Sequence, residues 1–167
     1  RRWSGRMSFS TPLWAKGETA AVTAQGKNDA NFRALFTSLK ELGHGNAFIR
    51  LGWEMNGSWF YWHATPDNEK DWKAAFRKIY KIAKEVSPDF QVVWNPNKSS
   101  DYGYDARRVW PEADCVDVAG PDWYGTYPAY HSAAQWDAGY MATGPGGAPL
   151  GLGAWRFACS IVPGLKD

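Results

Sequence analysis

Segments with the character of β-strands alternate with amphipathic helical segments along this chain, and that alternation narrows the possible folds more than any other feature. The predicted strands lie at residues 6–14, 46–56, 90–97 and 115–125. The second of them is apolar over most of its length, which is typical of a strand covered on both faces in a parallel sheet. Strands that alternate with helices form βαβ units, so the sequence predicts an α/β fold with parallel strands.

Two longer helices are predicted between these strands. The first runs from Asn28 or Asp29 to Gly43, and the second occupies residues 65–88. In each helix, apolar residues recur every three or four positions, which indicates one buried face. These residues are Phe32, Leu35, Phe36, Leu39 and Leu42 in the first helix and Trp72, Phe76, Ile79, Ala83 and Val86 in the second.

The length and charge of the chain limit its organisation and its partners. With 167 residues it is long enough for one core and too short to argue for two, so we expect a single domain over residues 1–167, with short helices at 131–141 and 152–159. A net charge of +2 with scattered basic residues argues against a nucleic-acid partner. No apolar run approaches the roughly 20 residues of a membrane span, so no membrane partner is expected, and no signal peptide is visible.

The cysteines and the aromatic residues bear on the kind of site. Cys115 and Cys159 lack the spacing of a metal site, so we expect no metal or other cofactor and treat both as buried thiols, although a disulfide is neither required nor excluded. Aromatic residues make up 16% of the chain, and many adjoin Gly, Asn or Ser. Such a composition suits a cleft that stacks on sugar faces and bonds to hydroxyls, while core packing explains part of it.

Polar residues follow three of the predicted strands. Glu54, Asn97 and Asp122 with Tyr124 fall at strand ends, and strand periodicity puts Arg50 on the same face as Glu54. In a (β/α)8 barrel the site is built at the carboxyl ends of the strands, where these groups would converge. The sequence therefore favours a partial (β/α)8 TIM barrel with parallel strands. The alternative, an open doubly wound sheet, would be expected to carry a glycine-rich turn that the first strand lacks.

Three ordered motifs resemble those of glycoside hydrolase family 26, the β-mannanase family. WEMNGSWFYW at residues 53–62 resembles the acid/base motif H-E-M-N-G-x-W-x-W-W, with Trp53 where the family often has His. WNPN at 94–97 resembles the W-x-P-N strand end, and VDVAGPDWY at 116–124 resembles the Y-V-D-x-x-G-x-D-x-Y segment. The resemblance covers residues 6 to about 160 and implies an internal fragment of a (β/α)8 catalytic domain.

The resemblance also implies roles for individual residues. Glu54 would be the general acid/base, which protonates the leaving glycosidic oxygen and later deprotonates the attacking water. Trp59 would stack on a sugar beside the scissile bond, and Asp122 and Tyr124 match the pair that organises the catalytic centre. The substrate-binding residues predicted here are Asn56, Trp59, Trp62, Asn97, Asp122 and Tyr124.

The neighbours of Glu54 agree with an acid role on physical grounds. A carboxyl group walled by Trp53 and Trp59 loses the hydration that favours its charged form, which raises its pKa. Arg50 would have the opposite effect if its guanidinium reached the carboxylate, and a buried Glu54–Arg50 ion pair is the alternative interpretation. We expect Arg50 to point toward the barrel interior and another partner.

Four other residues are weaker candidates. His63 and His131 could touch substrate from loops, but histidines beside aromatic residues are more often surface or packing residues. Trp72 lies on the apolar stripe of its helix and is expected in the core. Trp94 fits either the core or the floor of a cleft.

A retaining glycosidase needs a second carboxylate, held about 5 to 5.5 Å from the first. In the family this nucleophile is a Glu on a later strand, after a helix that residues 151–160 resemble. We expect that strand to be missing here, because four strands are found where a closed barrel needs eight, and the last seven residues match no expected element. Asp122 acting as the base of an inverting enzyme is the alternative.

These observations predict a glycosidase that acts on a β-linked polysaccharide or oligosaccharide. The resemblance implies retaining, endo-β-1,4-mannanase-like hydrolysis, with β-1,3-1,4-glucanase or xylanase activity of the same family as alternatives. A non-catalytic carbohydrate-binding fragment is a further alternative. Secretion is expected because polymeric substrates stay outside cells, and the oligomeric state stays open.

Overall fold

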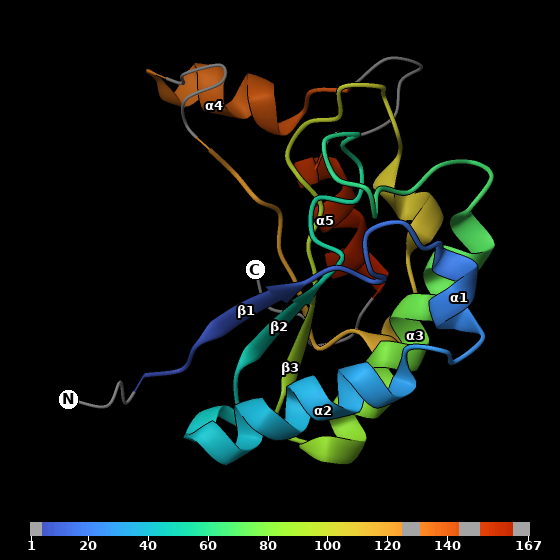
Figure 1. Ribbon diagram of the computed structural model, residues 1–167. Helices are drawn as coiled ribbons and strands as arrows, with labels where there is room; N and C mark the ends of the chain where they lie inside the picture. The colour runs from blue at the N-terminus through green and yellow to red at the C-terminus, as the bar shows by residue number, and fades with distance from the viewer. Residues whose placement is uncertain (1–4, 125–130, 144–150, 162–167) are drawn as a thin grey trace.

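Four parallel strands form one sheet, in the computed structural model that describes residues 5–124, 131–143 and 151–161 (Figure 1). The strands are β1 (Ser8–Thr11), β2 (Phe48–Leu51), β3 (Gln91–Trp94) and β4 (Val118–Ala119). Their order in the sheet is their order in the chain, and each neighbouring pair is parallel. Each crossover therefore adds the next strand at the same edge, as βαβ units do. The predicted α/β fold with parallel strands is confirmed.

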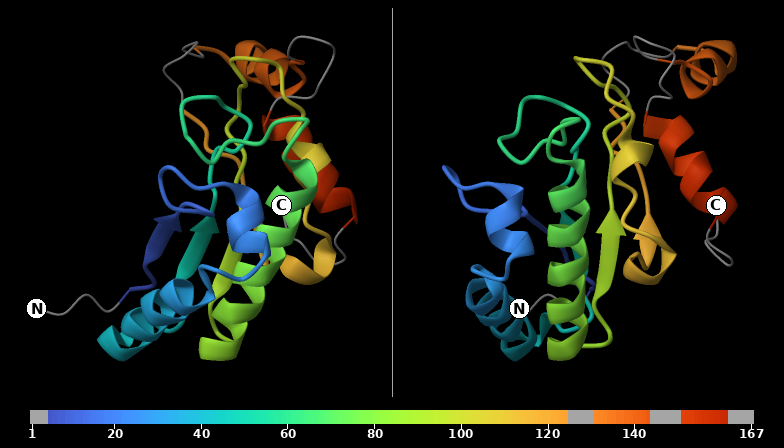
Figure 2. Two further views of the ribbon diagram at one scale, coloured as in Figure 1. Left: turned by 45° about the vertical axis from the view of Figure 1, so that its right-hand side comes forward. Right: turned by 90° about the vertical axis from the view of Figure 1, so that its right-hand side faces the viewer.

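Helices connect these strands and cover the sheet. They are α1 (Ala20–Ala24), α2 (Asp29–Leu39), the π-helical turn η1 (Lys40–His44), α3 (Glu69–Val86), the 3-10 turns η2 (Ala106–Val109) and η3 (Ala113–Cys115), α4 (Ala133–Tyr140) and α5 (Gly151–Ile161). The helices α1 and α2 pack against α3 beside the sheet, and α5 contacts β4 and η2 (Figure 2). Both longer helices predicted from the sequence are present.

The core lies between the sheet and the helices α2 and α3. Phe36 of α2 and Trp72 of α3 are fully buried, as is Val92 of β3. Trp94 is also fully buried, so it belongs to the core. The expectation that Trp72 is a core residue is confirmed.

The buried face of the first long helix is narrower than predicted. Leu35 is 39% exposed and Leu42 is 59% exposed. The regular helix ends at Leu39, and the chain reverses at Gly43, whose φ of +90° is a left-handed conformation that glycine adopts without strain. Leu42 therefore lies on a turn toward solvent, and its place in the core face was predicted wrongly.

The predicted strands are longer than the observed ones. The segment 46–56 contributes only Phe48–Leu51, and 115–125 contributes Val118–Ala119 with one isolated bridge between Asn97 and Asp122. The residues that follow these strands form loops that gather at the end of the sheet toward which the strands point (Figure 2). Polar groups from three strands therefore meet there.

The two cysteines differ in burial. Cys115 is buried, and burial raises the pKa of its thiol to about 11. Cys159 on α5 is only partly buried. The expectation of two buried thiols holds for Cys115 alone.

Candidate active site

Glu54 lies on a tight turn directly after β2 rather than on the strand itself. The strand ends at Leu51 because the next residue, Gly52, has a left-handed φ of +53°. A larger residue would not fit at this position, since its Cβ would lie 2.8 Å from Cγ of Leu13. Glu54 has φ +54°, a left-handed conformation that costs a non-glycine residue of the order of 1 to 3 kcal/mol. Its N–H donates to the carbonyl of Asn95 at 2.7 Å, which fixes the turn to the end of β3. Strand periodicity thus stops at Leu51, and the turn brings Glu54 to the strand ends.

The carboxyl group of Glu54 is buried and keeps its proton more firmly than a solvated one. The residue is 7% exposed, and this burial is the main reason why its pKa is raised. The nearby negative charge of Asp122 also raises the pKa, whereas hydrogen bonds from Asn97 and Trp59 act in the opposite direction. The net effect is a raised pKa, the direction that a general acid requires.

Trp59 is held against Glu54 and still presents surface to solvent. Its indole Nε1 donates to Oε2 of Glu54 at 2.7 Å, and the residue is 45% exposed. The ring lies directly over Gly57, where a Cβ would come within 2.1 Å of Cζ2 of Trp59. Glycine at this position allows the indole to fold back onto the carboxylate. The exposed part of the indole is suited to stacking on a sugar.

Arg50 binds Asp122 and not Glu54. Its Nε donates to Oδ1 of Asn95 at 2.7 Å, and its Nη2 forms an ion pair with Asp122. Asn95 in turn donates from Nδ2 to the carbonyl of Gly120 at 2.6 Å and to Oδ1 of Asp122 at 3.3 Å. The expectation that Arg50 has another partner is confirmed. Arg50 and Asn95 together fix the carboxylate that faces Glu54.

Asn95 has a role that the sequence did not reveal. Its backbone carbonyl accepts the N–H of Glu54. Its side chain accepts a hydrogen bond from Arg50 at Oδ1 and donates one to Asp122 from Nδ2. Asn95 is 4% exposed, and a buried polar side chain needs hydrogen-bond partners. A polar residue directly after an apolar strand was the sequence signal that could have indicated such a role. The sequence interpretation gave weight to Asn97 and passed over Asn95 in the same WNPN motif.

Asn56 and Asn97 join two loops and are nearly inaccessible. Asn56 donates from Nδ2 to the carbonyl of Asn97 at 2.9 Å and accepts the N–H of Asn97 at 2.8 Å. The two residues are 1% and 7% exposed. Both were predicted to bind substrate. The side-chain amide of Asn56 forms its hydrogen bonds with the backbone of Asn97 and Ser99. Asn97 lies close enough to hydrogen bond to Glu54.

Trp62 also differs from the prediction of a substrate contact. It is 5% exposed, and its Nε1 donates to the carbonyl of Trp53 at 2.9 Å. Its ring stacks on Phe60 at a centroid distance of 4.3 Å and packs against Trp53 at 4.2 Å. The structure therefore places Trp62 in the core beneath the loop, where it offers little surface to a ligand.

Asp122 and Tyr124 complete the group of residues around Glu54. The N–H of Asp122 donates to the carbonyl of Pro96 at 2.8 Å, which attaches the loop after β4 to the end of β3. Tyr124 is 57% exposed, and the negative charge of Asp122, followed by that of Glu54, raises its pKa. Of the predicted residues, the structure brings Glu54, Trp59, Asn97, Asp122 and Tyr124 together at one end of the sheet.

The two histidines do not join this group. His63 is partly buried, and its Nδ1 lies 2.6 Å from the carbonyl of Phe60. His131 is exposed at the start of the segment that leads into α4. The expectation that His63 is a packing residue is consistent with its contacts.

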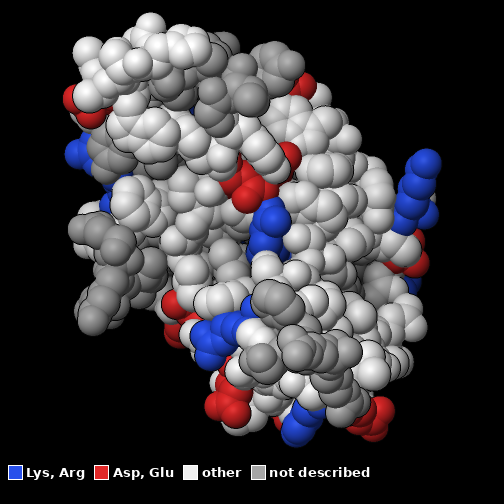
Figure 3. All heavy atoms as spheres, turned by 90° about the vertical axis from the view of Figure 1, so that its left-hand side faces the viewer, with Lys and Arg blue, Asp and Glu red and all other residues white. Residues whose placement is uncertain are grey.

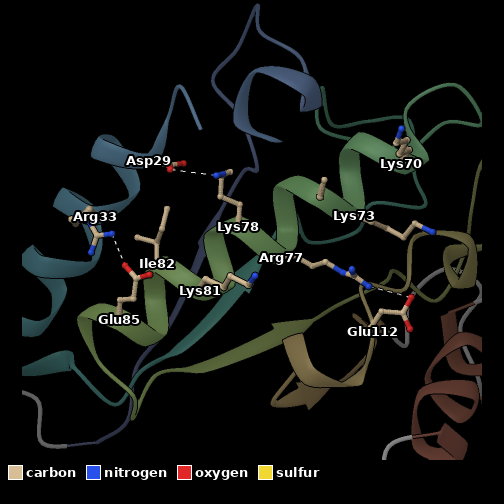
Figure 4. A pocket seen from close by; sticks show the side chains of 11 residues that line it. Asp29, Arg33, Lys70, Lys73, Arg77, Lys78, Lys81, Ile82, Glu85 and Glu112 are labelled. Carbon is tan, nitrogen blue, oxygen red and sulfur yellow. Dashed lines mark hydrogen bonds and ion pairs between the residues drawn. The ribbon is translucent and has the colours of Figure 1, made fainter. Parts of the chain in front are cut away.

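A second group of charged side chains lies away from Glu54, and some of its members form ion pairs. A groove of about 670 Å³ runs over the outer side of α3 and is lined by basic side chains, with Arg77 paired to Glu112 and Arg33 paired to Glu85 (Figure 4). On the face seen in Figure 3, acidic and basic side chains adjoin near the centre, and most of the surrounding surface is uncharged. The groove shares no residue with the group around Glu54.

Two further features concern ligands and membranes. Within the described parts of the chain, no three His, Cys, Asp or Glu residues are grouped so that they could hold a metal ion. Among the helices that the structure describes, none combines the length and the apolar character needed to cross a membrane.

Comparisons with known proteins agree on one family. The model of glycosyl hydrolase family 26 matches residues 31–142. A mannan endo-1,4-beta-mannosidase of Bacillus subtilis is 30% identical over 141 residues, which are 75% of this chain and 37% of that protein. A second, from Bacillus subtilis strain 168, is 33% identical over 130 residues, which are 70% of this chain and 35% of that protein. The chain thus spans little more than a third of the length of these relatives.

A solved structure supports the fold. The structure of a GH26 beta-mannanase from Bacteroides ovatus matches with a TM-score of 0.55 and 19% identity, covering 82% of this chain and 45% of that one. The match shows that the sheet and its helices correspond to part of a (β/α)8 barrel. The predicted partial barrel is confirmed, and the open doubly wound sheet is set aside.

Proposed function

Because this chain belongs to glycosyl hydrolase family 26, we propose that it supplies the general acid/base of a retaining, endo-β-1,4-mannanase-like enzyme. The observation that carries the proposal is the state of Glu54, a buried carboxyl with a raised pKa beside the half-exposed indole of Trp59. The polysaccharide would lie across the strand ends, stacked on Trp59 and close to Tyr124. As part of the proposal, the reaction takes place outside the cell, where polymeric substrate is found.

Glu54 would act twice in the reaction. In the first step it donates its proton to the glycosidic oxygen, while a nucleophilic carboxylate bonds to the anomeric carbon and the glycosidic bond breaks. In the second step it is a carboxylate and takes a proton from the water that displaces the nucleophile from the anomeric carbon. Burial favours the protonated state, and the hydrogen bonds from Trp59 and Asn97 stabilise the carboxylate that follows. The two opposing effects suit a group that must hold and release a proton in each turnover.

The nucleophile is proposed to come from outside this chain. Among the described residues, Asp122 is the carboxylate that lies beside Glu54, and Arg50 and Asn95 already bind it. Such a carboxylate is suited to organising the site, as the family resemblance implies. The chain also covers only 35 to 37% of the mannosidases that it matches, which leaves room for a nucleophile strand elsewhere in the parent protein.

Sugar binding tests the proposal directly. Intrinsic tryptophan fluorescence would be titrated with oligosaccharides of mannan, β-1,3-1,4-glucan and xylan, with mannohexaose as the mannan fragment. We expect saturable binding of mannohexaose that is lost in Trp59→Ala and kept in Tyr61→Ala, because Tyr61 lies two residues away and is similarly exposed, at 42% against 45%. A flat response to all three sugars would overturn the proposal. Preference for the glucan or xylan fragment would favour the corresponding alternative activity.

Catalysis is tested by reducing-end release from mannan. We expect the 167-residue chain to release no more reducing ends than its Glu54→Gln variant, since the nucleophile is proposed to be missing. Turnover above that control would place the nucleophile within this chain and point to Asp122. Binding without turnover in a parent protein that carries the later strands would instead favour a carbohydrate-binding function.

A further inference from the structure

Lys98 is a buried cation in the loop that follows β3, next to the candidate site. The residue is 6% exposed, although lysine is rarely buried to this degree. Burial lowers the pKa of its ammonium group, so the surroundings make the charge costly. A cation kept there needs contacts that offset this cost.

Those contacts involve three consecutive residues of the loop after β4. The backbone N–H of Lys98 donates to the carbonyl of Asp122 at 3.0 Å. Its ammonium donates to the carbonyl of Tyr124 at 2.6 Å and lies 4.9 Å from the ring centroid of Trp123. A carbonyl dipole and an aromatic face are both favourable partners for a desolvated ammonium. The backbone of Lys98 thus holds Asp122, while its side chain holds the next two residues of the same loop.

We propose that Lys98 is a positioning residue that fixes Asp122 and Tyr124 against the end of β3 for sugar binding. The inference rests on the proposed function, because it assigns Lys98 to the same site. Lys98 does not touch the sugar; it acts through the loop. Without the ammonium, the backbone of Tyr124 loses its hydrogen bond and the ring of Trp123 loses its cation.

Lys84 offers a matched control at the opposite end of the same strand. Its ammonium donates to the carbonyl of Phe90, just before β3, and lies 5.5 Å from the ring centroid of Tyr80. It also pairs with Asp117 at 2.8 Å, and its side chain is 22% exposed. Both ammonium groups therefore bind a backbone carbonyl and face an aromatic ring, but Lys84 does so at the amino end of β3 and Lys98 beyond its carboxyl end.

The experiment compares Lys98→Met with Lys84→Met, since methionine keeps most of the apolar stem and removes the charge. Hydrogen exchange of the 118–124 segment would be measured by mass spectrometry, and mannohexaose affinity by tryptophan fluorescence. In Lys98→Met we expect exchange of this segment to rise at least about tenfold, because the loop loses the contacts of the ammonium with Trp123 and Tyr124. We expect mannohexaose affinity to fall about tenfold in the same variant. Lys84→Met is expected to leave both quantities within about twofold of the unsubstituted chain, while its melting temperature falls.

The two readouts separate the possible failures. Equal exchange in Lys98→Met and the unsubstituted chain would overturn the positioning role, whether or not sugar binds. Faster exchange with unchanged affinity would show that Lys98 orders the loop without serving the sugar, which also overturns the inference. If the unsubstituted chain binds none of the sugars, the proposed function fails, and with it the claim that Lys98 positions a sugar site. If Lys84→Met lost as much affinity as Lys98→Met, the loss would reflect general destabilisation, and the positioning role of Lys98 would be overturned.

Discussion

The indole of Trp59 is fixed to the carboxylate of Glu54 by a hydrogen bond of 2.7 Å, five residues along the same loop. The bond ties the group proposed to transfer the proton to the ring proposed to carry the sugar. A change in the loop that moves the indole should therefore affect both functions together. The indole of Trp59 reaches Glu54 by lying over Gly57.

Gly57→Ala should displace the indole. Its Cβ would come within 2.1 Å of Trp59, and the clash is with a rigid ring. We expect a loss of about 1 to 3 kcal/mol of unfolding free energy and a shift in tryptophan emission. Gly120→Ala is the control, because a Cβ at Gly120 meets nothing within 4 Å. Identical emission spectra for the two variants would show that the ring does not lie over Gly57.

Glu54→Gln should stabilise the fold at neutral pH. Because the folded pKa of Glu54 lies above its ordinary value of 4.5, folding takes up a proton, and the stability of the unsubstituted chain falls as pH rises through the interval above 4.5. Glutamine has no such titration. The stability difference in favour of the variant should grow with pH across this interval and then level off. Urea unfolding at a series of pH values measures it, and a difference that shrinks with rising pH would mean a lowered pKa.

The Arg50–Asp122 pair should show strong energetic coupling. The side chains are 27% and 19% exposed, so Arg50→Met leaves a largely buried carboxylate without its cation. We expect a loss of about 2 kcal/mol, much of it recovered when Asp122→Asn is added. The half-exposed Arg33–Glu85 pair, at 51% and 57%, is the comparison, and its coupling should stay below about 1 kcal/mol. Double-mutant cycles from urea unfolding give both energies, and similar values would contradict the assigned burial.

Two adjacent residues of α2 should differ sharply in their contribution to stability. Phe36 is fully buried and Leu35 is 39% exposed. Phe36→Ala should cost about 3 to 5 kcal/mol through the cavity it leaves. Leu35→Ala should cost less than about 1 kcal/mol, since its side chain keeps much of its contact with water. Thermal unfolding would decide, and a large loss at Leu35 would mean that another surface covers it.

The sequence predicted the sheet well because parallel strands and their helices leave long periodic signals. It predicted the ends of the strands less well. The alternation of side chains along a strand predicted that Arg50 and Glu54 share one face. In the structure, Gly52 and Glu54 have left-handed backbone conformations that end the strand, so a turn sets the direction of the carboxyl group. A turn of this kind depends on close packing against Leu13, which adjacent residues do not reveal.

The candidate site was also predicted only in part. The motif resemblance located Glu54 and Trp59, which meet in the structure. It could not separate an aromatic residue that faces solvent from one that packs underneath, and so Trp62 was assigned to the substrate although it is 5% exposed. The contacts of Lys98 and Asn95 could not be predicted because they join segments that are 26 and 45 residues apart in the chain.

The agreement between strand order in the sheet and strand order in the chain has a consequence for synthesis. Because β2 pairs with β1 and β3 with β2, every strand that leaves the ribosome finds its neighbour already made. Among the four described strands, the sheet can grow by one βα unit at a time, because each added strand pairs with the strand made just before it. The Glu54 turn would then acquire its hydrogen bond to the carbonyl of Asn95 only after about forty further residues have been translated, and the carboxylate of Asp122 would join it later still.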